Sequence, residues 1–287
     1  PPNGQGIAAL QMLNMLERYD LKSLGWGSPE LAHLLIETKK LAFADRAKFY
    51  ADMRQAQVPL QSLISKDYAR QRLELFQPQR ALLGVPAGDP KLVQGDTIYL
   101  CVVDQDRNCC SLIQSNFHGF GSHHVAGNLG FAIQNRGALF ALDEQHANCL
   151  QPGKRPFHTI IPAMVTRDKK PLLVFGVMGG DMQPQGHVQV LVNWIDFGMN
   201  IQMAGDAARI RHDGSATPTG IPEEAAGGKV FVESGLPDST VSALKAWGHE
   251  VGYGGGFGGY QAILIDWEQG ILQGASEARK DGAALGY

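Results

Sequence analysis

The chain lacks long apolar runs and carries no excess of basic residues. No stretch of its 287 residues approaches the roughly 18–20 consecutive apolar positions of a membrane-spanning helix, so we expect no membrane partner. The formal net charge is −3 at pH 7 and the pI is about 6.3, which predicts no basic surface for nucleic acid. These absences favour a small molecule or a peptide as the partner.

Cysteine is scarce, and its spacing excludes the usual zinc motifs. The four cysteines are Cys101, Cys109, Cys110 and Cys149, and no two of them form a C-x-x-C pair. Cys109 and Cys110 are neighbours on a predicted strand, so their side chains point to opposite faces and cannot easily pair. We therefore expect buried, reduced thiols and a cytoplasmic protein, with the periplasm as the alternative location.

The chain begins at Pro-Pro-Asn, without an initiator methionine or the charged and apolar segments of a signal peptide. We expect it to be part of a longer protein, with any targeting segment upstream of Pro1. Hydrophobic residues make up 44% of the sequence and charged residues 18%, which predicts a globular fold with a substantial core.

Residues 1–96 have the pattern of a helical region that ends in a loop. Apolar residues recur at helical spacing near the start of the chain. Ser28 followed by Pro29 predicts the N-cap and first position of a second helix, and Ser65 predicts the cap of a third. Residues 77–96 are rich in proline and glycine without periodicity, which predicts an extended surface loop.

Strand patterns dominate from Thr97 onward. Short polar turns join several of them, as in β-hairpins. Antiparallel hairpins combined with helices predict a layered α+β fold. The predicted strands are 97–104, 109–115, 129–135, 161–167, 171–177, 260–267 and 271–277, and the predicted helices are 186–199 and 239–249.

Several familiar site motifs are missing or misplaced. Gly254 to Gly259 formally match G-x-G-x-x-G, but they precede a predicted strand, whereas a dinucleotide loop follows a strand and opens a helix. A close-packed or mobile glycine loop is expected there. No G-x-S-x-G elbow occurs, and the adjacent His123 and His124 lack the spacing of metal ligands. We therefore predict no cofactor and no metal.

A glycine pair offers one element of a catalytic site. Gly179 and Gly180 follow an apolar strand and precede a helix, where backbone N–H groups without a Cβ nearby can face an oxyanion. An ordinary strand-to-helix turn is the alternative. Asp181, Gln183 and Gln185 are candidates for supporting the site, although helix capping is the more ordinary role for Asp181.

Thr97 offers a second element, because it opens a strand after a Gly-Asp turn. A hydroxyl is a weak nucleophile until a base removes its proton, and a terminal threonine supplies that base in its own α-amine. Cleavage between Asp96 and Thr97 would release an amine with an ordinary pKa of about 7.7–8.0, which suits proton transfer at neutral pH. Taken alone, Thr97 is more simply a β-branched residue at the start of a strand.

Long motifs occur in one order along nearly the whole chain, in residues 1–21, 39–46, 95–122, 153–165, 176–204 and 274–287. Together they resemble the γ-glutamyltranspeptidase family of N-terminal-nucleophile hydrolases. The resemblance implies an α+β fold, a four-layer αββα sandwich made as one precursor that cuts itself. It implies that residues 1–96 end the large (α) subunit and that residues 97–287 form the small (β) catalytic subunit.

The resemblance also assigns roles to the two candidate elements. Thr97 matches the family's new N-terminal threonine, which is both nucleophile and donor of the basic amine. Ser115 matches the second hydroxyl that hydrogen-bonds the nucleophile. Gly179 and Gly180 match the glycine pair of the oxyanion hole.

The substrate end departs from the transpeptidase pattern. His158 and Thr159 stand where the family has a serine pair, so only the second hydroxyl remains. Phe117, Arg136 and Leu139 stand where transpeptidases carry amide and carboxylate side chains that hold an amino acid group. Losing a carboxylate and gaining a guanidinium favours an anionic group over an α-ammonium. The pattern resembles the amidohydrolase branch, which includes oxamate amidohydrolase and cephalosporin-acylase-like proteins.

These observations predict an amide-bond hydrolase acting on a small carboxylate-bearing amide, with Phe117, Arg136, His158 and Thr159 lining the substrate site. A surface or structural ion pair is the alternative role for Arg136. A γ-glutamyltransferase or glutathione hydrolase, and an inactive fragment or non-catalytic relative, are the alternative functions. The expected partners are the amide substrate, the large-subunit segment upstream of Pro1 and further αβ units in a homo-oligomer.

Overall fold

The computed structural model describes residues 3–85, 95–215, 217–220 and 227–287, and it has the predicted α+β composition. The chain divides into two compact units. Unit 1 comprises residues 1–93, 135–159 and 208–255, and unit 2 comprises 94–134, 160–207 and 256–287. These units are defined by contacts and the subunits by cleavage, so the boundary between residues 96 and 97 stays a prediction. No helix among the described residues is long and apolar enough to cross a membrane.

Unit 1 is mainly helical, as the sequence predicts for its first part. Ser28 Oγ accepts a hydrogen bond of 3.1 Å from Leu31 N, and Ser65 Oγ accepts one of 3.2 Å from Tyr68 N, so both predicted caps are confirmed. The helices are α1 (Gly6–Leu16), α2 (Leu21–Leu24), α3 (Pro29–Phe49), α4 (Leu60–Leu63), α5 (Lys66–Leu73), the 3-10 helix η1 (Arg136–Leu139) and α8 (Asp238–Ala246).

A three-stranded sheet completes unit 1 and was not predicted. It consists of β5 (Ile210–Asp213), β6 (Lys229–Val232) and β7 (Glu250–Tyr253), with β6 antiparallel to β5 and parallel to β7. Helices α3 and α8 share an apolar core with this sheet, in which Ile36, Val232 and Leu244 are buried. Each strand has four residues, too few for a clear alternation of apolar and polar positions.

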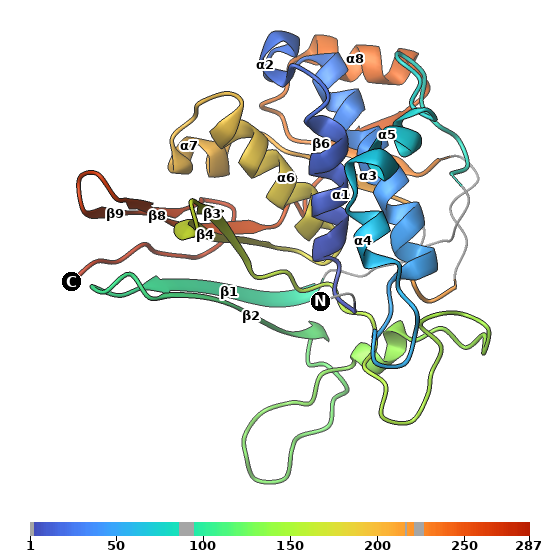
Figure 1. The fold of residues 1–287 in the computed structure, drawn as a ribbon, viewed down its shortest axis with the longest axis vertical. Helices are drawn as coiled ribbons and strands as arrows, with labels where there is room; N and C mark the ends of the chain where they lie inside the picture. The colour runs from blue at the N-terminus through green and yellow to red at the C-terminus, as the bar shows by residue number, and fades with distance from the viewer. Residues whose placement is uncertain (1–2, 86–94, 216, 221–226) are drawn as a thin grey trace. The chain divides into compact units, whose positions relative to one another are not determined.

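Unit 2 is layered. Strands β1 (Gly95–Val103) and β2 (Cys109–His118) form an antiparallel hairpin. A second antiparallel sheet has the order β3 (Ala163–Arg167), β4 (Lys170–Met178), β8 (Gly259–Asp266) and β9 (Ile271–Ser276). The hairpin packs on one face of this sheet, and α6 (Met182–Ile195) and α7 (Ile201–Asp206) cover the other (Figure 1). Unit 2 thus has a helix–sheet–sheet order of layers.

Most predicted elements of unit 2 are confirmed, but two are wrong in part. Residues 129–135 form no strand; Ala132 makes only an isolated bridge to Val125. Phe131 and its apolar neighbours there are exposed, so no sheet covers the stretch. Helix α6 starts four residues before the predicted start at Gly186, because the turn after Gly180 already has helical geometry.

The thiols and the loop before Thr97 also differ from expectation. All four cysteines are free, but Cys149 alone is buried and Cys110 is exposed, because the outer face of the hairpin is uncovered. Residues 77–85 form neither helix nor strand, as predicted, and residues 86–94 lie outside the described residues. Strand β1 begins at Gly95, two residues earlier than predicted.

Candidate active site

Thr97 and Ser115 face each other across the β1–β2 hairpin of unit 2. Thr97 pairs with Ser115 in the strand register, and its Oγ1 donates a hydrogen bond of 3.1 Å to Ser115 Oγ. Facing positions of an antiparallel pair carry side chains on the same side of the sheet, so the register alone brings these hydroxyls together. The structure therefore places the predicted nucleophile beside the predicted second hydroxyl.

The backbone around this pair is irregular. The register shifts between Asp96 and Thr97, so the bulge falls immediately before the candidate nucleophile. Bulges commonly redirect a side chain beside an active site. Phe117 has a φ of 77°, which is rare for an aromatic residue and costs on the order of 1–3 kcal/mol. Its N–H donates a bond of 2.9 Å to Ser115 Oγ, which helps hold this conformation.

Gly179 and Gly180 lie in the turn between β4 and α6, as predicted. Their φ values are 122° and 58°, a region that residues with a Cβ rarely adopt. A Cβ on Gly179 would also lie 3.0 Å from Gly258 Cα, so the glycine loop of residues 256–259 packs closely against this turn. The expectation of a close-packed glycine loop is confirmed for this part, and the loop leads into strand β8.

Asp181, Gln183 and Gln185, the candidates for supporting the site, differ in the hydrogen bonds that their side chains make. Asp181 occupies the N-cap position of α6, but its side chain makes no capping hydrogen bond, so the capping role is wrong. Gln183 is fully buried, and its Oε1 accepts a bond of 2.8 Å from Ile161 N. Gln185 Nε2 donates to Asp181 O at 3.0 Å, within the first turns of the helix.

The predicted substrate residues Arg136 and Thr159 meet in unit 1. Arg136, on η1, is 6% exposed, and its Nη1 donates a bond of 3.1 Å to Thr159 Oγ1. Burial lowers the pKa of Arg136 to about 10, which leaves the guanidinium charged at neutral pH. Gln5 Nε2 donates to Thr159 O at 2.7 Å and Gln5 Oε1 accepts from Arg46, so Thr159 is fixed from two sides.

The other two predicted substrate residues are His158 and Phe117. His158 is half-buried, and its N–H donates a bond of 2.8 Å to Asn3 O. Phe117 and Leu139 are both buried and apolar. The structure thus brings together Thr97 with Ser115 in unit 2, and Arg136 with Thr159 in unit 1.

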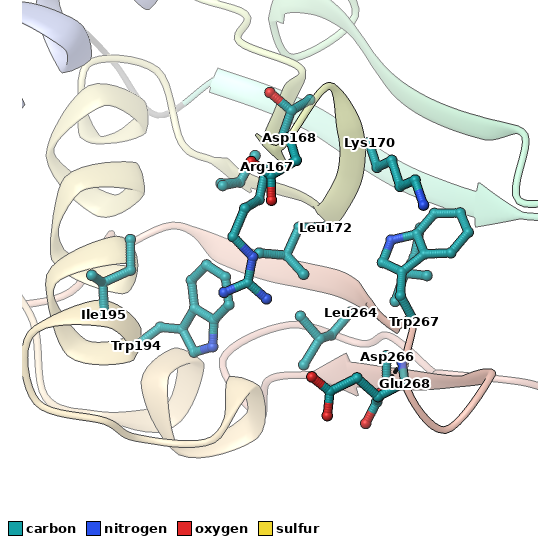
Figure 2. Close-up of a pocket in the computed structure, with 13 residues that line it drawn as sticks. Arg167, Asp168, Lys170, Leu172, Trp194, Ile195, Leu264, Asp266, Trp267 and Glu268 are labelled. Atoms are coloured by element: carbon teal, nitrogen blue, oxygen red, sulfur yellow. Dashed lines mark hydrogen bonds between the residues drawn. The ribbon is translucent and has the colours of Figure 1, made fainter.

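A cavity of about 820 Å³ lies elsewhere in unit 2, between the β3–β4 turn, the end of α6 and the β8–β9 turn (Figure 2). Its lining includes Arg167, Trp194, Leu264 and Glu268. Lys170 Nζ lies 5.1 Å from the centroid of the Trp267 ring at one rim. None of the eight predicted site residues lines this cavity, so it is separate from the candidate active site.

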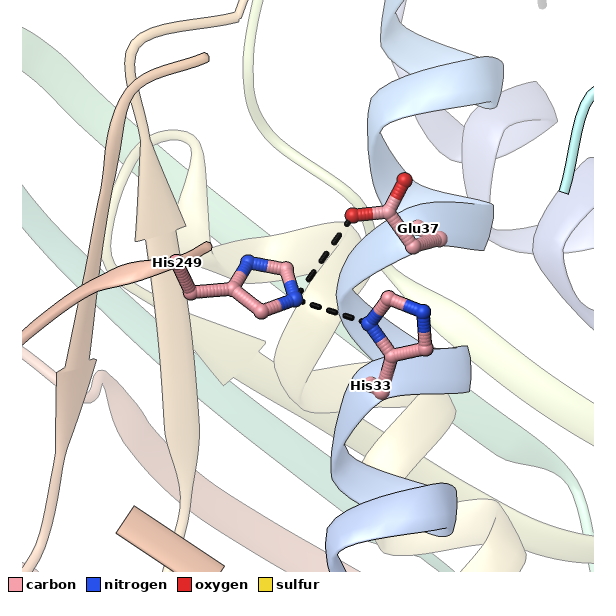
Figure 3. Close-up of side chains that lie close together, drawn as sticks. All are labelled: His33, Glu37 and His249. Atoms are coloured by element: carbon pink, nitrogen blue, oxygen red, sulfur yellow. Dashed lines mark hydrogen bonds and ion pairs between the residues drawn. The ribbon is translucent and has the colours of Figure 1, made fainter. Parts of the chain in front are cut away.

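His33, Glu37 and His249 form a buried cluster in unit 1 that sequence analysis missed (Figure 3). His33 Nδ1 lies 2.7 Å from His249 Nε2, and His249 Nε2 lies 3.8 Å from Glu37 Oε1. The i,i+4 spacing of His33 and Glu37 on α3 was a visible signal, but the third member comes from the loop before β7.

Lys40 makes this cluster a poor metal site. Its Nζ forms an ion pair of 2.9 Å with Glu37 Oε1 and donates a bond of 3.1 Å to Leu82 O. Glu37 Oε2 accepts from Leu82 N at 3.2 Å. The ammonium already neutralises the carboxylate that a divalent ion would need, so the chemistry favours a hydrogen-bonded network.

Comparison with known proteins identifies the family of the chain. The family model described as gamma-glutamyltranspeptidase matches residues 1–287. The glutathione hydrolase-like YwrD proenzyme of Bacillus subtilis (strain 168) is 40% identical over 290 residues, covering 100% of this chain and 53% of its own length. The oxamate amidohydrolase proenzyme of Klebsiella pneumoniae is 32% identical over 292 residues, covering 100% of this chain and 52% of its own length.

A solved structure agrees with these matches. The crystal structure of cephalosporin acylase from Bacillus halodurans superimposes with a TM-score of 0.85 at 39% identity, covering 100% of this chain and 51% of that one. The chain spans about half the length of the curated relatives it matches. Sequence motifs, fold and comparisons together show that the chain belongs to the γ-glutamyltranspeptidase family and has an N-terminal-nucleophile hydrolase fold.

Proposed function

We propose that this chain is part of an amide-bond hydrolase whose nucleophile is Thr97, released by self-cleavage at Asp96–Thr97. The observation that carries the proposal is the 3.1 Å hydrogen bond from Thr97 Oγ1 to Ser115 Oγ. A hydroxyl held in one orientation can be aimed at a carbonyl carbon. Relatives named as proenzymes support a precursor that matures by cleavage.

The proposed reaction has two chemical steps. The Thr97 α-amine takes the proton from Oγ1, through a water molecule, while Oγ1 attacks the amide carbon. The N–H groups of Gly179 and Gly180 hold the negative oxygen of the tetrahedral intermediate, which collapses to an ester on Thr97 as the protonated amine leaves. Water then attacks the ester, releasing the carboxylic acid and restoring the hydroxyl.

The proposed substrate class is a small amide that carries a carboxylate. Arg136 and Thr159 support it, because a buried guanidinium beside a hydroxyl offers charged and neutral donors to one anion. The oxamate amidohydrolase name of a relative at 32% identity is consistent with this class. Arg136 Nη1 already bonds within the protein, so a structural role remains its competing explanation.

The exposed face of the hairpin supports a protein partner. Ile98, Leu100 and Val102 alternate along β1 on this face, with exposed fractions of 58%, 42% and 49%, and Leu112 of β2 joins them. Contiguous apolar surface on a sheet marks an interaction site. We propose that the remaining large-subunit segment of the longer protein covers it, in keeping with relatives about twice the length of this chain.

Replacement of Thr97 in the full-length protein tests the nucleophile. Thr97→Ala is expected to stay an uncut precursor by mass spectrometry and to lose at least about a thousandfold in kcat/KM. Thr97→Ser keeps a hydroxyl and an α-amine, so it is expected to mature and retain activity. An amide-mimicking electrophile should label Thr97 of the mature wild type. A fully active Thr97→Ala protein would overturn the proposal, and the absence of any labelling would favour an inactive relative.

Glutathione hydrolysis or γ-glutamyl transfer is the second candidate, because the relative at 40% identity is named glutathione hydrolase-like. Phe117 and Leu139 argue against it, since two buried apolar side chains offer nothing to an α-ammonium group. Turnover of a γ-glutamyl anilide, compared with that of an oxamate-like amide on the same preparation, separates the two candidates.

A further inference from the structure

A chain of hydrogen bonds fixes the β1–β2 hairpin to the start of β3 in unit 2. Tyr99 Oη lies 2.7 Å from Ser111 Oγ, and Ala163 N donates a bond of 3.1 Å to the same Ser111 Oγ. Burial raises the pKa of Tyr99, so its hydroxyl stays neutral. Ser111 is therefore the point at which the two sheets share one polar contact.

The Tyr99 ring makes the same connection by packing. A Cβ placed on Gly176 of β4 would lie 2.5 Å from the ring, so the ring sits directly on the glycine backbone. Tyr99 also packs with Ile113 and Met178 in a small core between the sheets. Because Tyr99 is two residues after Thr97 on β1, both side chains lie on the same face of the strand.

Gln183 makes the matching connection on the side of the glycine pair. Its Oε1 accepts from Ile161 N at 2.8 Å, and it is fully buried on the first turn of α6. No described protein atom pairs with its Nε2, which is also buried. An unpaired buried amide is unfavourable, and an apolar side chain of similar size would avoid this cost. An apolar side chain at position 183 would lose the hydrogen bond that Gln183 Oε1 accepts from Ile161 N.

The two connections end on one short segment. Residues 160–163, here called the strap, are bound at Ile161 to the helix that follows Gly180, and at Ala163 to the hairpin that carries Thr97. Ile161 and Ala163 are only two residues apart, so these two backbone hydrogen bonds join both elements to one short segment. The strap thus lies between the two elements that carry the proposed chemistry.

We propose that the strap, held by Ser111 and Tyr99 on one side and by Gln183 on the other, sets the position of Thr97 relative to the N–H groups of Gly179 and Gly180. This inference rests on the proposed function of Thr97. The three side chains are positioning residues and do not touch the reacting atoms. A displacement of about 1 Å between nucleophile and acceptor can cost about a hundredfold in rate, so the strap acts on kcat.

Ser111→Ala and Gln183→Met test the strap in the full-length protein. Each is expected to lower kcat by about 10- to 100-fold while KM changes less than about threefold, with kcat counted per Thr97 that the electrophile labels. Self-cleavage should slow in parallel, because the same hydroxyl performs it. Ser111→Thr keeps the hydroxyl and is expected to recover most of the loss, whereas Tyr99→Phe keeps the ring and should cost less than Ser111→Ala.

The controls separate this inference from the proposed function. Ser65→Ala removes the cap of α5 and lowers stability, so it shows what lost stability alone does to kcat. If Thr97→Ala is active, the proposed function fails. If Thr97→Ala is inactive while Ser111→Ala and Gln183→Met keep wild-type kcat and self-cleavage, the strap fails alone. Loss of activity in Ser111→Ala without recovery in Ser111→Thr would also contradict it.

Discussion

The two units bury different kinds of side chain. Unit 1 buries many charged residues, among them Glu37, Lys39, Lys40, Asp45, Arg46, Asp52, Arg136, Lys154 and Arg209. Among the described residues of unit 2, Glu277 is the one buried Asp, Glu, Lys or Arg, and it pairs with Arg279 at 2.6 Å. The core of unit 2 is instead apolar, with Leu173, Phe175 and Tyr260 almost fully buried.

The two units therefore hold their candidate site residues in place by different kinds of interaction. Unit 2 holds Thr97 and the glycine pair with neutral hydrogen bonds and close packing, which depend on volume and shape. Unit 1 buries charged pairs such as Glu37 with Lys40, whose stability depends on both partners being present. We therefore expect unit 1 to respond to the loss of a charge and unit 2 to the loss of volume.

The largest effect is expected from Glu37→Gln. The substitution leaves the Lys40 ammonium buried without its carboxylate, which typically costs about 3–5 kcal/mol of unfolding free energy. Chemical denaturation of the full-length protein measures it. The double variant Glu37→Gln with Lys40→Met removes both charges and is expected to recover much of the loss.

Leu173→Ala is the matched variant in unit 2. Removing this fully buried side chain is expected to cost about 2–5 kcal/mol through lost burial and a cavity. Its effect should not depend on ionic strength. If the double variant Glu37→Gln with Lys40→Met is no more stable than Glu37→Gln alone, then volume, and not charge, governs the stability of unit 1 as well.

A smaller effect is expected from Arg136→Met on substrate choice. Methionine keeps most of the volume but removes the guanidinium that we propose for the substrate carboxylate. A hydrogen bond to a charged group is worth about 1.5–3 kcal/mol, so kcat/KM should fall about 10- to 100-fold for a carboxylate-bearing amide. The corresponding neutral amide should lose little. Equal losses for both substrates would leave Arg136 with a structural role.

Near neutral pH, the smallest effect is a pH dependence that belongs to unit 1. Burial, then the charges of Lys40 and His33, lower the pKa of His249 to about 3 from its ordinary 6.5. The depressed pKa in the folded state means that the stabilisation is fully present above pH 6.5 and is lost as the pH falls from 6.5 toward 3, by at most about 1.4 kcal/mol per pH unit. His249→Gln should flatten the curve over this range. A curve unchanged from wild type would show that other groups cause the acid sensitivity.

Local patterns were enough for many of the elements and for part of the site. The caps at Ser28 and Ser65 were predictable because one side chain bonds the backbone three residues ahead. The hairpin was predictable from its short polar turn, and it then placed Thr97 near Ser115. The strand predicted at 129–135 was wrong because apolar residues form a strand only where other structure covers them. No local pattern reveals whether such a cover exists.

The sequence by itself determined the family, the order of motifs and the candidate nucleophile, because these depend on residue identity along the chain. The tertiary structure decided which distant side chains meet: Arg136 with Thr159, Glu37 and His33 with His249, and Tyr99 with Gly176. Those contacts join segments between 23 and 216 residues apart, as for Arg136 and Thr159 and for His33 and His249. Chain connectivity does not restrict such pairs, so packing and hydrogen bonding in the folded state select them.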